Sequence, residues 1–156
     1  MTSSTLKTRL LNTLDADSGG RVSACGVLGL RAGTGLLIFY IHGWHKLEGG
    51  LAFLRDGTPW RLAEEVAGMH FPAPLASAFA ATAAQFILAP LLAAGIFTRA
   101  SAAILTTVLS VAVLQNILAG RDPQLAVLYT LVVAAFVFIG GGRFSVDARL
   151  ARRTRR

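Results

Sequence analysis

Apolar residues run in four long stretches along this chain, and polar or charged residues gather between them. The stretches cover residues 22–46, 74–97, 100–118 and 124–139, of which the last is the shortest. Each is close to the roughly 20 residues that a helix needs to cross the hydrocarbon layer of a membrane. Helices and closed barrels are the structures that satisfy their backbone polar groups within lipid. The pattern therefore predicts an all-α, integral membrane four-helix bundle over residues 22–142.

Two of the three connections are short. Residues 95–99 and 119–123 leave room only for tight turns, so the helices that they join are expected to be antiparallel neighbours.

The long connection, residues 48–73, contains a helix signal of its own. Thr58 followed by Pro59 is typical of an N-cap with proline in the first helical turn. Apolar residues then recur at helical spacing, at Leu62, Val66 and Met69. We expect a short interfacial helix between helices 1 and 2, with Trp60 at the depth of the lipid headgroups, broken by Pro72 and Pro74.

Composition and charge agree with a membrane protein. Hydrophobic residues make up 54% of the chain, charged residues 15%, and the mean hydropathy is +0.59, whereas soluble domains carry about 25% charge. The net charge is +7, and six of the fifteen basic residues lie in residues 143–156. A basic segment beside apolar helices fits anionic lipid headgroups better than nucleic acid. The expected partner is the lipid bilayer, with no nucleic acid.

Basic residues in short loops also predict the orientation of the bundle. Ten lie on the side of the two termini and four on the other side, which places both termini in the cytoplasm. Residues 1–21 then form a polar N-terminal segment and residues 143–156 a basic cytoplasmic tail. The expected location is a bacterial-type inner (plasma) membrane, with multiple spans.

Several cofactor classes are disfavoured by the sequence. The single cysteine, Cys25, excludes an intramolecular disulfide and a four-cysteine metal site. The second, third and fourth stretches contain no histidine, so a haem held between two helices by histidines is not expected. The three histidines have only Glu48 as a convincing companion, and no nucleotide-binding glycine motif is present. We expect no haem, metal or nucleotide.

Arg31 is the most informative single residue. An arginine inside a membrane helix costs about 2.5–3.5 kcal/mol on insertion scales, so it usually faces protein or water and has a partner. The alternative is a side chain near the cytoplasmic end that extends to the headgroups.

A polar stripe follows Arg31 along the same helix. Helical spacing puts the following residues on one face of the helix: Arg31, Gly35, Ile38, His42 and His45 or Lys46. Arg31 and His42 are eleven residues apart, roughly 16 Å along the axis, so they cannot share one small ligand. We therefore expect two polar stations, the outer one formed by His42, His45 and Lys46. Its imidazoles could hydrogen-bond a quinone carbonyl or transfer its protons; the alternative is an interfacial anchor with Trp44.

Other helices offer polar residues that could complete the outer station. Gln85 is an amide near the middle of the second stretch, and Tyr129 lies one turn into the fourth. Gln115 and Asn116 lie near the end of the third stretch. Each could contact a ligand, but such residues also serve as hydrogen-bonding contacts between helices or as caps of helix ends.

Short motifs in a fixed order resemble those of the DoxX family of membrane proteins. They are Arg31, Gly35, Gly43 and Lys46; residues 68–74; Gly95, Thr98 and Arg99; and Gly140, Gly142, Arg143, Phe144, Ser145 and Asp147. The resemblance implies a four-helix membrane subunit. Some members are the quinone-reactive part of thiosulfate:quinone oxidoreductases, and related eukaryotic proteins are cargo receptors. The chain departs from the family at Gln85 and Gln124, where members commonly have acidic residues.

Two functions are compatible with these observations. The first is a quinone-linked redox subunit that binds a quinone through Arg31, His42, His45 and Lys46, with Gln85 or Tyr129 assisting. Its electrons would come from a separate dehydrogenase as redox partner. The second is a non-enzymatic membrane adaptor or assembly factor, and a homo-oligomer fits either function. A small-molecule permease is least favoured, because four short helices leave little room for a pathway.

Overall fold

A computed structural model describes residues 20–154. Nearly all of the expected polar N-terminal segment, residues 1–21, lies outside the described residues. The described part is helical and contains no strand, which confirms the all-α prediction.

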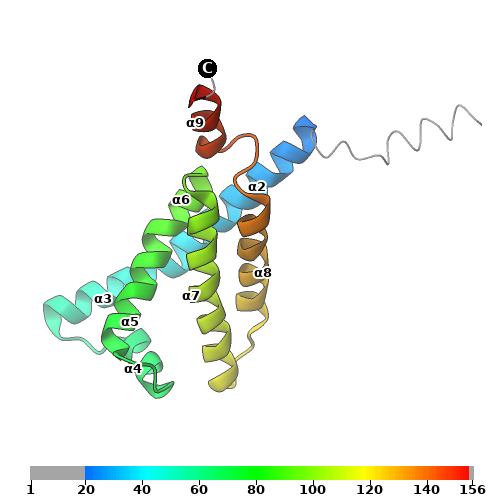
Figure 1. Ribbon diagram of the computed structural model, residues 1–156. Helices are drawn as coiled ribbons and strands as arrows, with labels where there is room; N and C mark the ends of the chain where they lie inside the picture. Colours follow the sequence, from blue (N-terminus) through cyan, green and yellow to red (C-terminus); the bar gives the residue numbers. More distant parts are fainter. Residues whose placement is uncertain (1–19, 155–156) are drawn as a thin grey trace, which may run out of the picture.

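Within residues 20–154, six helical rods follow one another (Figure 1). The first is formed by α2 (Arg21–Leu37), η1 (Ile38–Trp44) and α3 (His45–Asp56) without interruption. The short α4 (Arg61–Gly68) comes next. The third is formed by α5 (Pro74–Ala83), η2 (Ala84–Leu88) and α6 (Ala89–Ala94). The last three are α7 (Thr98–Leu118), α8 (Gln124–Ile139) and α9 (Val146–Thr154).

Three of these rods are long and apolar enough to cross a membrane. They cover Val22–Asp56, Pro74–Ala94 and Thr98–Leu118. α8 is apolar but has only 16 residues. It packs along α7 and exposes apolar side chains such as Phe138, which is 81% exposed. The structure supports a membrane helical bundle, and the count of four spans stays a prediction.

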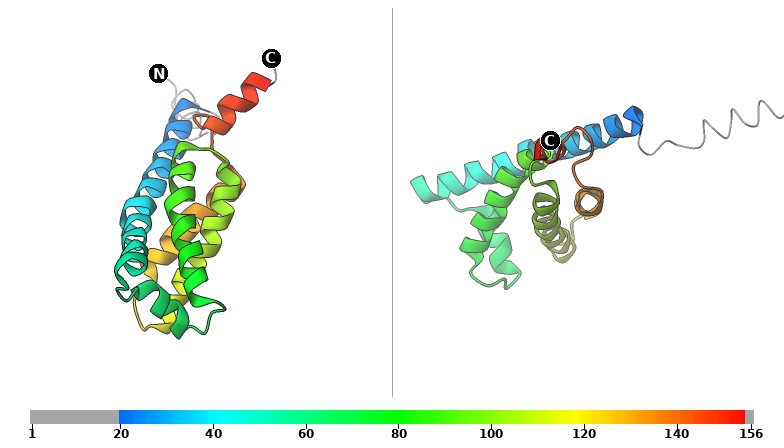
Figure 2. Two further views of the ribbon diagram at one scale, coloured as in Figure 1. Left: turned by 90° about the vertical axis from the view of Figure 1, so that its left-hand side faces the viewer. Right: turned by 45° about the horizontal axis from the view of Figure 1, so that its top comes forward.

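The two ends of the bundle differ in what they contain. The start of α2, the α6–α7 turn and α9 lie at one end, which we call the terminal end (Figures 1 and 2). The end of α3, α4 and the α7–α8 connection lie at the other, which we call the α4 end. Since the first and last described helices share one end, the arrangement agrees with an even number of spans. The cytoplasmic location of the terminal end stays a prediction.

The core between the long helices is formed by aliphatic side chains and Phe136. It contains Ile38, Ala89, Leu92, Ala102, Leu105, Leu109, Val133 and Phe136. Large apolar side chains on the outside of the rods, such as Leu131 and Ile104, are half exposed or more. Lipid would cover them in a membrane, which is why so apolar a chain needs only a small core.

Two π-helical segments, η1 and η2, pack against each other in the middle of the bundle. η2 ends two residues before Pro90, which lacks a backbone donor and would clash with the carbonyl of Phe86 in a regular α-helix. The wider π-turn relieves this conflict. On the η1 side, a Cβ at Gly43 would lie 3.2 Å from the carbonyl oxygen of Gln85. Glycine therefore allows the two segments to approach.

The connection between the first two long rods differs from the prediction. The first helix continues to Asp56, well past residue 46, and ends at Gly57 in the left-handed region (φ +68°). The predicted interfacial helix exists as α4, but it begins at Arg61 with Trp60 as its N-cap. The assignment of Thr58 as N-cap and of Pro59 to the first turn was wrong.

Trp60 is the reason for this later start. Its side chain is 5% exposed and packs on the flat surface that Gly49 and Gly50 leave on α3, where an added Cβ would lie 3.0–3.1 Å from the indole. Its ring centroid is 4.6 Å from that of Phe79. Trp60 is thus a core residue that joins α3, α4 and α5, and its depth in the membrane stays a prediction.

Candidate functional site: a polar cavity at the α4 end

A cavity of about 500 Å³ lies between the helices at the α4 end. We call it the polar cavity. Its lining comes from the first rod, α4, η2, α7, α8 and the α7–α8 connection, and its polar members are His42, Lys46, Arg61, Glu65, Gln85, Gln115, Asn116, Arg121, Asp122 and Tyr129. Four of the six residues that the sequence nominated, His42, Lys46, Gln85 and Tyr129, therefore share one cavity.

The π-helical segments place two of these side chains. His42 lies in η1 and Gln85 in η2, and these are the two segments that Gly43 brings together. The His42 ring meets the ring of Tyr129 from α8 edge-on, with centroids 5.7 Å apart and an interplanar angle of 84°. One wall of the cavity thus combines an imidazole, an amide and a phenol.

Gln85 is the polar residue of this wall with an unmet hydrogen bond. Its side chain is 1% exposed, and within the described part of the chain no donor reaches its Oε1 atom. A buried polar atom without a partner costs roughly 1–3 kcal/mol, so native proteins rarely retain one. Gln85 lines the polar cavity, so this oxygen is a candidate acceptor for a hydrogen-bond donor bound there.

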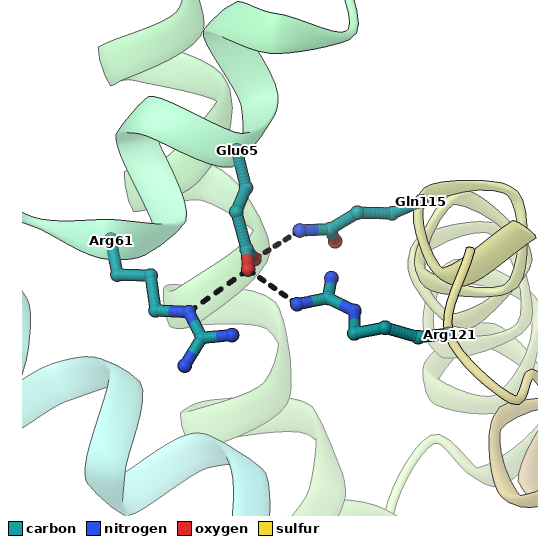
Figure 3. A network of polar contacts seen from close by, with 4 residues as sticks. All are labelled: Arg61, Glu65, Gln115 and Arg121. Carbon is teal, nitrogen blue, oxygen red and sulfur yellow. Dashed lines mark hydrogen bonds and ion pairs between the residues drawn. The ribbon is translucent and has the colours of Figure 1, made fainter. Parts of the chain in front are cut away.

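Glu65 of α4 is the centre of a charged network at the mouth of the polar cavity (Figure 3). Its Oε1 atom accepts hydrogen bonds from Arg61 Nε at 3.0 Å and from Arg121 Nη1 at 2.7 Å. Its Oε2 atom accepts one from the Gln115 amide. Since Gln115 lies on α7 and Arg121 on the α7–α8 connection, Glu65 holds α4 across the cavity. Sequence reasoning missed this network; the Arg61–Glu65 spacing of one helical turn was its only local signal.

The Glu65 carboxyl has a pKa below its usual range. Burial raises this pKa, but hydrogen bonds and charge from Arg121 and Arg61 lower it by more, and the net direction is down from 4.5. A depressed pKa in the folded state means that the carboxylate stabilises the fold above pH 4.5. That contribution is lost as the pH falls through the lower, folded-state pKa.

We therefore predict that acidification below pH 4.5 detaches α4 from α7. In a Trp44→Phe background, in which Trp60 is the only tryptophan, its emission should shift to the red in this pH range. At neutral pH, Glu65→Gln should reduce the hydrogen-exchange protection of α4 five- to tenfold, about 1 kcal/mol for a partly exposed charged hydrogen bond. The exposed neighbour provides the control, Glu64→Gln. An unchanged acid transition in Glu65→Gln would contradict the assignment.

His45 lies outside the polar cavity. Its side chain is exposed, and its Nδ1 atom is 3.4 Å from the Glu48 carboxylate. Trp44 donates a hydrogen bond from Nε1 to the same carboxylate at 2.9 Å. His45 borders an adjoining cavity beside Trp60, which shares His42, Lys46, Arg61, Leu62 and Glu65 with the polar cavity. The structure thus divides the predicted outer station: His42 and Lys46 face the polar cavity, whereas His45 belongs to a surface cluster with Trp44.

Arg31 lies towards the terminal end and is not part of the polar cavity. Its side chain is 1% exposed, and its Nη1 atom donates a hydrogen bond to the Leu92 carbonyl at 2.8 Å. Leu92 is in the last turn of α6, where its carbonyl also accepts a hydrogen bond from the Gly95 N–H at 3.0 Å and where the helix dipole favours a cation. Arg31 therefore lies apart from His42 and Lys46 and reaches protein instead of headgroups.

Asp147 closes the terminal end beside Arg31. Its carboxylate accepts hydrogen bonds from the backbone N–H groups of Phe97 and Thr98, both at 2.9 Å, and from the Thr98 hydroxyl at 2.8 Å. It thereby caps the first turn of α7. Burial raises the pKa of Asp147, but the hydrogen bonds from Thr98 and Phe97 and the charge of Arg31 lower it by more. The region expected as a basic tail is thus anchored to the bundle at its start.

The terminal-end contacts involve the same residues that resemble the DoxX motifs, and the sequence model of the DoxX family matches residues 26–140. The chain belongs to the DoxX family. No curated protein and no solved structure matches it. In this DoxX protein, Arg31, Gly95, Thr98 and Asp147 meet where α6, α7 and α9 join. Part of the family motifs thus lies at the terminal end, whereas Lys46 lines the polar cavity at the α4 end.

Proposed function

We propose that this DoxX protein is the membrane subunit of a quinone-linked oxidoreductase and that the polar cavity receives the quinone headgroup. The observation that carries this proposal is the buried Gln85 side chain, which lines the cavity together with His42 and whose Oε1 atom has no donor among the described residues. The volume of about 500 Å³ lies within the roughly 300–1,000 Å³ of small-molecule sites.

The residues of the polar cavity fit a ring with two oxygen substituents. The Gln85 amide both donates and accepts, the His42 imidazole can donate or accept, and the Lys46 ammonium donates. A bound quinone supplies two-electron, two-proton redox chemistry. His42 is suited to hold or release a proton beside it, because imidazole titrates near neutral pH. Gln85 is suited to orient the headgroup, because its amide forms hydrogen bonds and stays uncharged at any physiological pH.

The family context supports the same function. The chain is a DoxX membrane protein, and its sequence carries no nucleotide-binding glycine motif. In this proposal a separate dehydrogenase supplies the electrons and docks on the membrane subunit, in a bacterial inner membrane with the terminal end in the cytoplasm. Arg31 contributes to the bundle and not to the quinone contacts.

The proposal predicts that protein purified in mild detergent retains a quinone, found by organic extraction and mass spectrometry. His42→Ala and Gln85→Leu should each reduce the quinone content about tenfold, since a lost hydrogen bond in a buried site is worth about 1–1.5 kcal/mol. Matched controls use a histidine and a glutamine outside the polar cavity, His45→Ala and Gln124→Leu; both side chains are exposed.

A wild-type protein that binds no natural or added quinone would overturn the proposal. If such a protein instead co-purified with one constant partner protein, the membrane adaptor function would be favoured. Equal losses in the two control variants would show that the quinone lies elsewhere in the bundle.

A further inference from the structure

A second cavity, of about 310 Å³, adjoins the polar cavity and is almost entirely apolar. We call it the apolar groove. It lies between α5 and α7, with α4 beneath it. α7 contacts the rod that contains α5 mainly at η2 and α6. α5 itself diverges from α7 towards the α4 end (Figure 1).

Small side chains on α5 keep the apolar groove open. At helical spacing, α5 and η2 present Ser77, Ala80, Ala81 and Ala84 to it. The facing side of α7 is aliphatic, with Ile104, Val108 and Val111, and α4 contributes Leu62, Val66 and Met69. Ala80 and Ile104 are exposed at its border, so the groove opens on a surface that lipid would cover.

The apolar groove and the polar cavity adjoin each other. Lys46, Leu62, Ala112 and Gln115 line both of them. Lys46 and Gln115 stand at the border, where their polar ends can meet a headgroup. The site as a whole therefore has a polar chamber inside the bundle and an apolar extension that leads to the bilayer. This arrangement matches a molecule with a polar head and a hydrocarbon tail.

We propose that the apolar groove binds the isoprenoid tail of the same molecule whose headgroup occupies the polar cavity, and that the molecule enters sideways from the bilayer between α5 and α7. This inference rests on the proposed function, because the headgroup must lie in the polar cavity. It adds a tail site formed by α4, α5 and α7 and a route of entry. It also defines the ligand as a long-chain quinone.

The test compares short-chain and ten-carbon-chain analogues of ubiquinone and of menaquinone, matched in headgroup. Binding to the full-length protein in detergent is measured by quenching of its tryptophan fluorescence. The wild-type protein should bind the ten-carbon analogue at least tenfold more tightly than the short one, because each buried methylene adds to the affinity. Ala81→Phe, which fills the groove, should remove this difference and change short-chain binding less than twofold.

The matched control is Ala83→Phe, on the same helix but with an exposed side chain outside the groove; it should retain the chain-length difference. If the short analogue binds but chain length has no effect, or if Ala81→Phe weakens both analogues equally, the tail site is refuted while the proposed function stands. If the wild-type protein binds neither analogue, both proposals fail.

A second measurement uses the wild-type protein alone, in lipid nanodiscs, with a quinone that carries a photoreactive diazirine on its tail. Crosslinks to residues 77–84 and 104–115 are expected, and excess unlabelled long-chain quinone should abolish them. Crosslinks confined to the outer surface of α8, or unaffected by the competitor, would overturn the inference.

Discussion

Arg31→Leu is expected to reach the membrane in normal amounts and to yield a bundle that is less stable by about 1.5–3 kcal/mol, the usual cost of losing a hydrogen bond from a charged group. The leucine removes the donor that lies 2.8 Å from the Leu92 carbonyl oxygen, which retains the Gly95 N–H at 3.0 Å, and it removes the cation beside Asp147. Insertion should be unaffected, because leucine is better tolerated than arginine in a membrane helix.

Thermal unfolding in detergent measures this loss, and the amount of protein in the membrane fraction measures insertion. An exposed arginine at the same end provides the control, Arg99→Leu. Arg99 donates a longer hydrogen bond, 3.3 Å to the Phe138 carbonyl. Its substitution should reduce the stability by less than about 1 kcal/mol. Wild-type stability in Arg31→Leu would refute the role of Arg31 at the terminal end. Quinone content should fall no more than stability does, since Arg31 is outside the polar cavity.

Gly95→Ala is expected to have the largest effect of any single methyl group added to this chain. Gly95 has a φ of +76°, and a Cβ there would overlap with Arg31 Nη1 and lie 2.6 Å from Ser145 Cβ. Neither the buried guanidinium nor the start of α9 can move without losing hydrogen bonds. We expect a loss of about 3 kcal/mol or more, from backbone strain and overpacking together.

Gly120→Ala separates these two causes. Gly120 has a similar φ of +64°, but no atom lies within 4 Å of an added Cβ. It should cost only the strain of the left-handed conformation, about 1 kcal/mol. Equal losses of stability in the two variants, measured by thermal unfolding, would show that the contact between Gly95 and Arg31 is not tight in solution.

The sequence predicted those features that depend on local pattern. Apolar stretches gave the long helices, and helical spacing gave the amphipathic face of α4 with Leu62 and Val66, both of which are buried. It also grouped His42, Lys46, Gln85 and Tyr129, because polar residues at similar depths of neighbouring helices meet inside a bundle.

Features that depend on distant parts of the chain were missed. Glu65 meets Gln115 and Arg121 across 50 and 56 residues, and no local pattern reports such contacts. Trp60 is buried because Gly49 and Gly50 leave a flat surface on α3, whereas an isolated tryptophan near a span suggests an interface. The π-helical segments depart from the spacing of 3.6 residues on which the prediction relied, although Pro90 was a signal for one of them.

The unequal lengths of the long helices determine how the protein sits in a bilayer. A rod of 35 residues, Val22–Asp56, is roughly 50 Å long; even a tilt of about 40° leaves it longer than a hydrocarbon layer of about 30 Å. α8, with 16 residues, is only about 24 Å long. If α8 is the fourth span, lipid must be compressed beside it while the first helix emerges into the headgroups. The hydrocarbon layer should therefore be thinner beside α8 than beside the first rod, and thin bilayers should favour insertion of the protein.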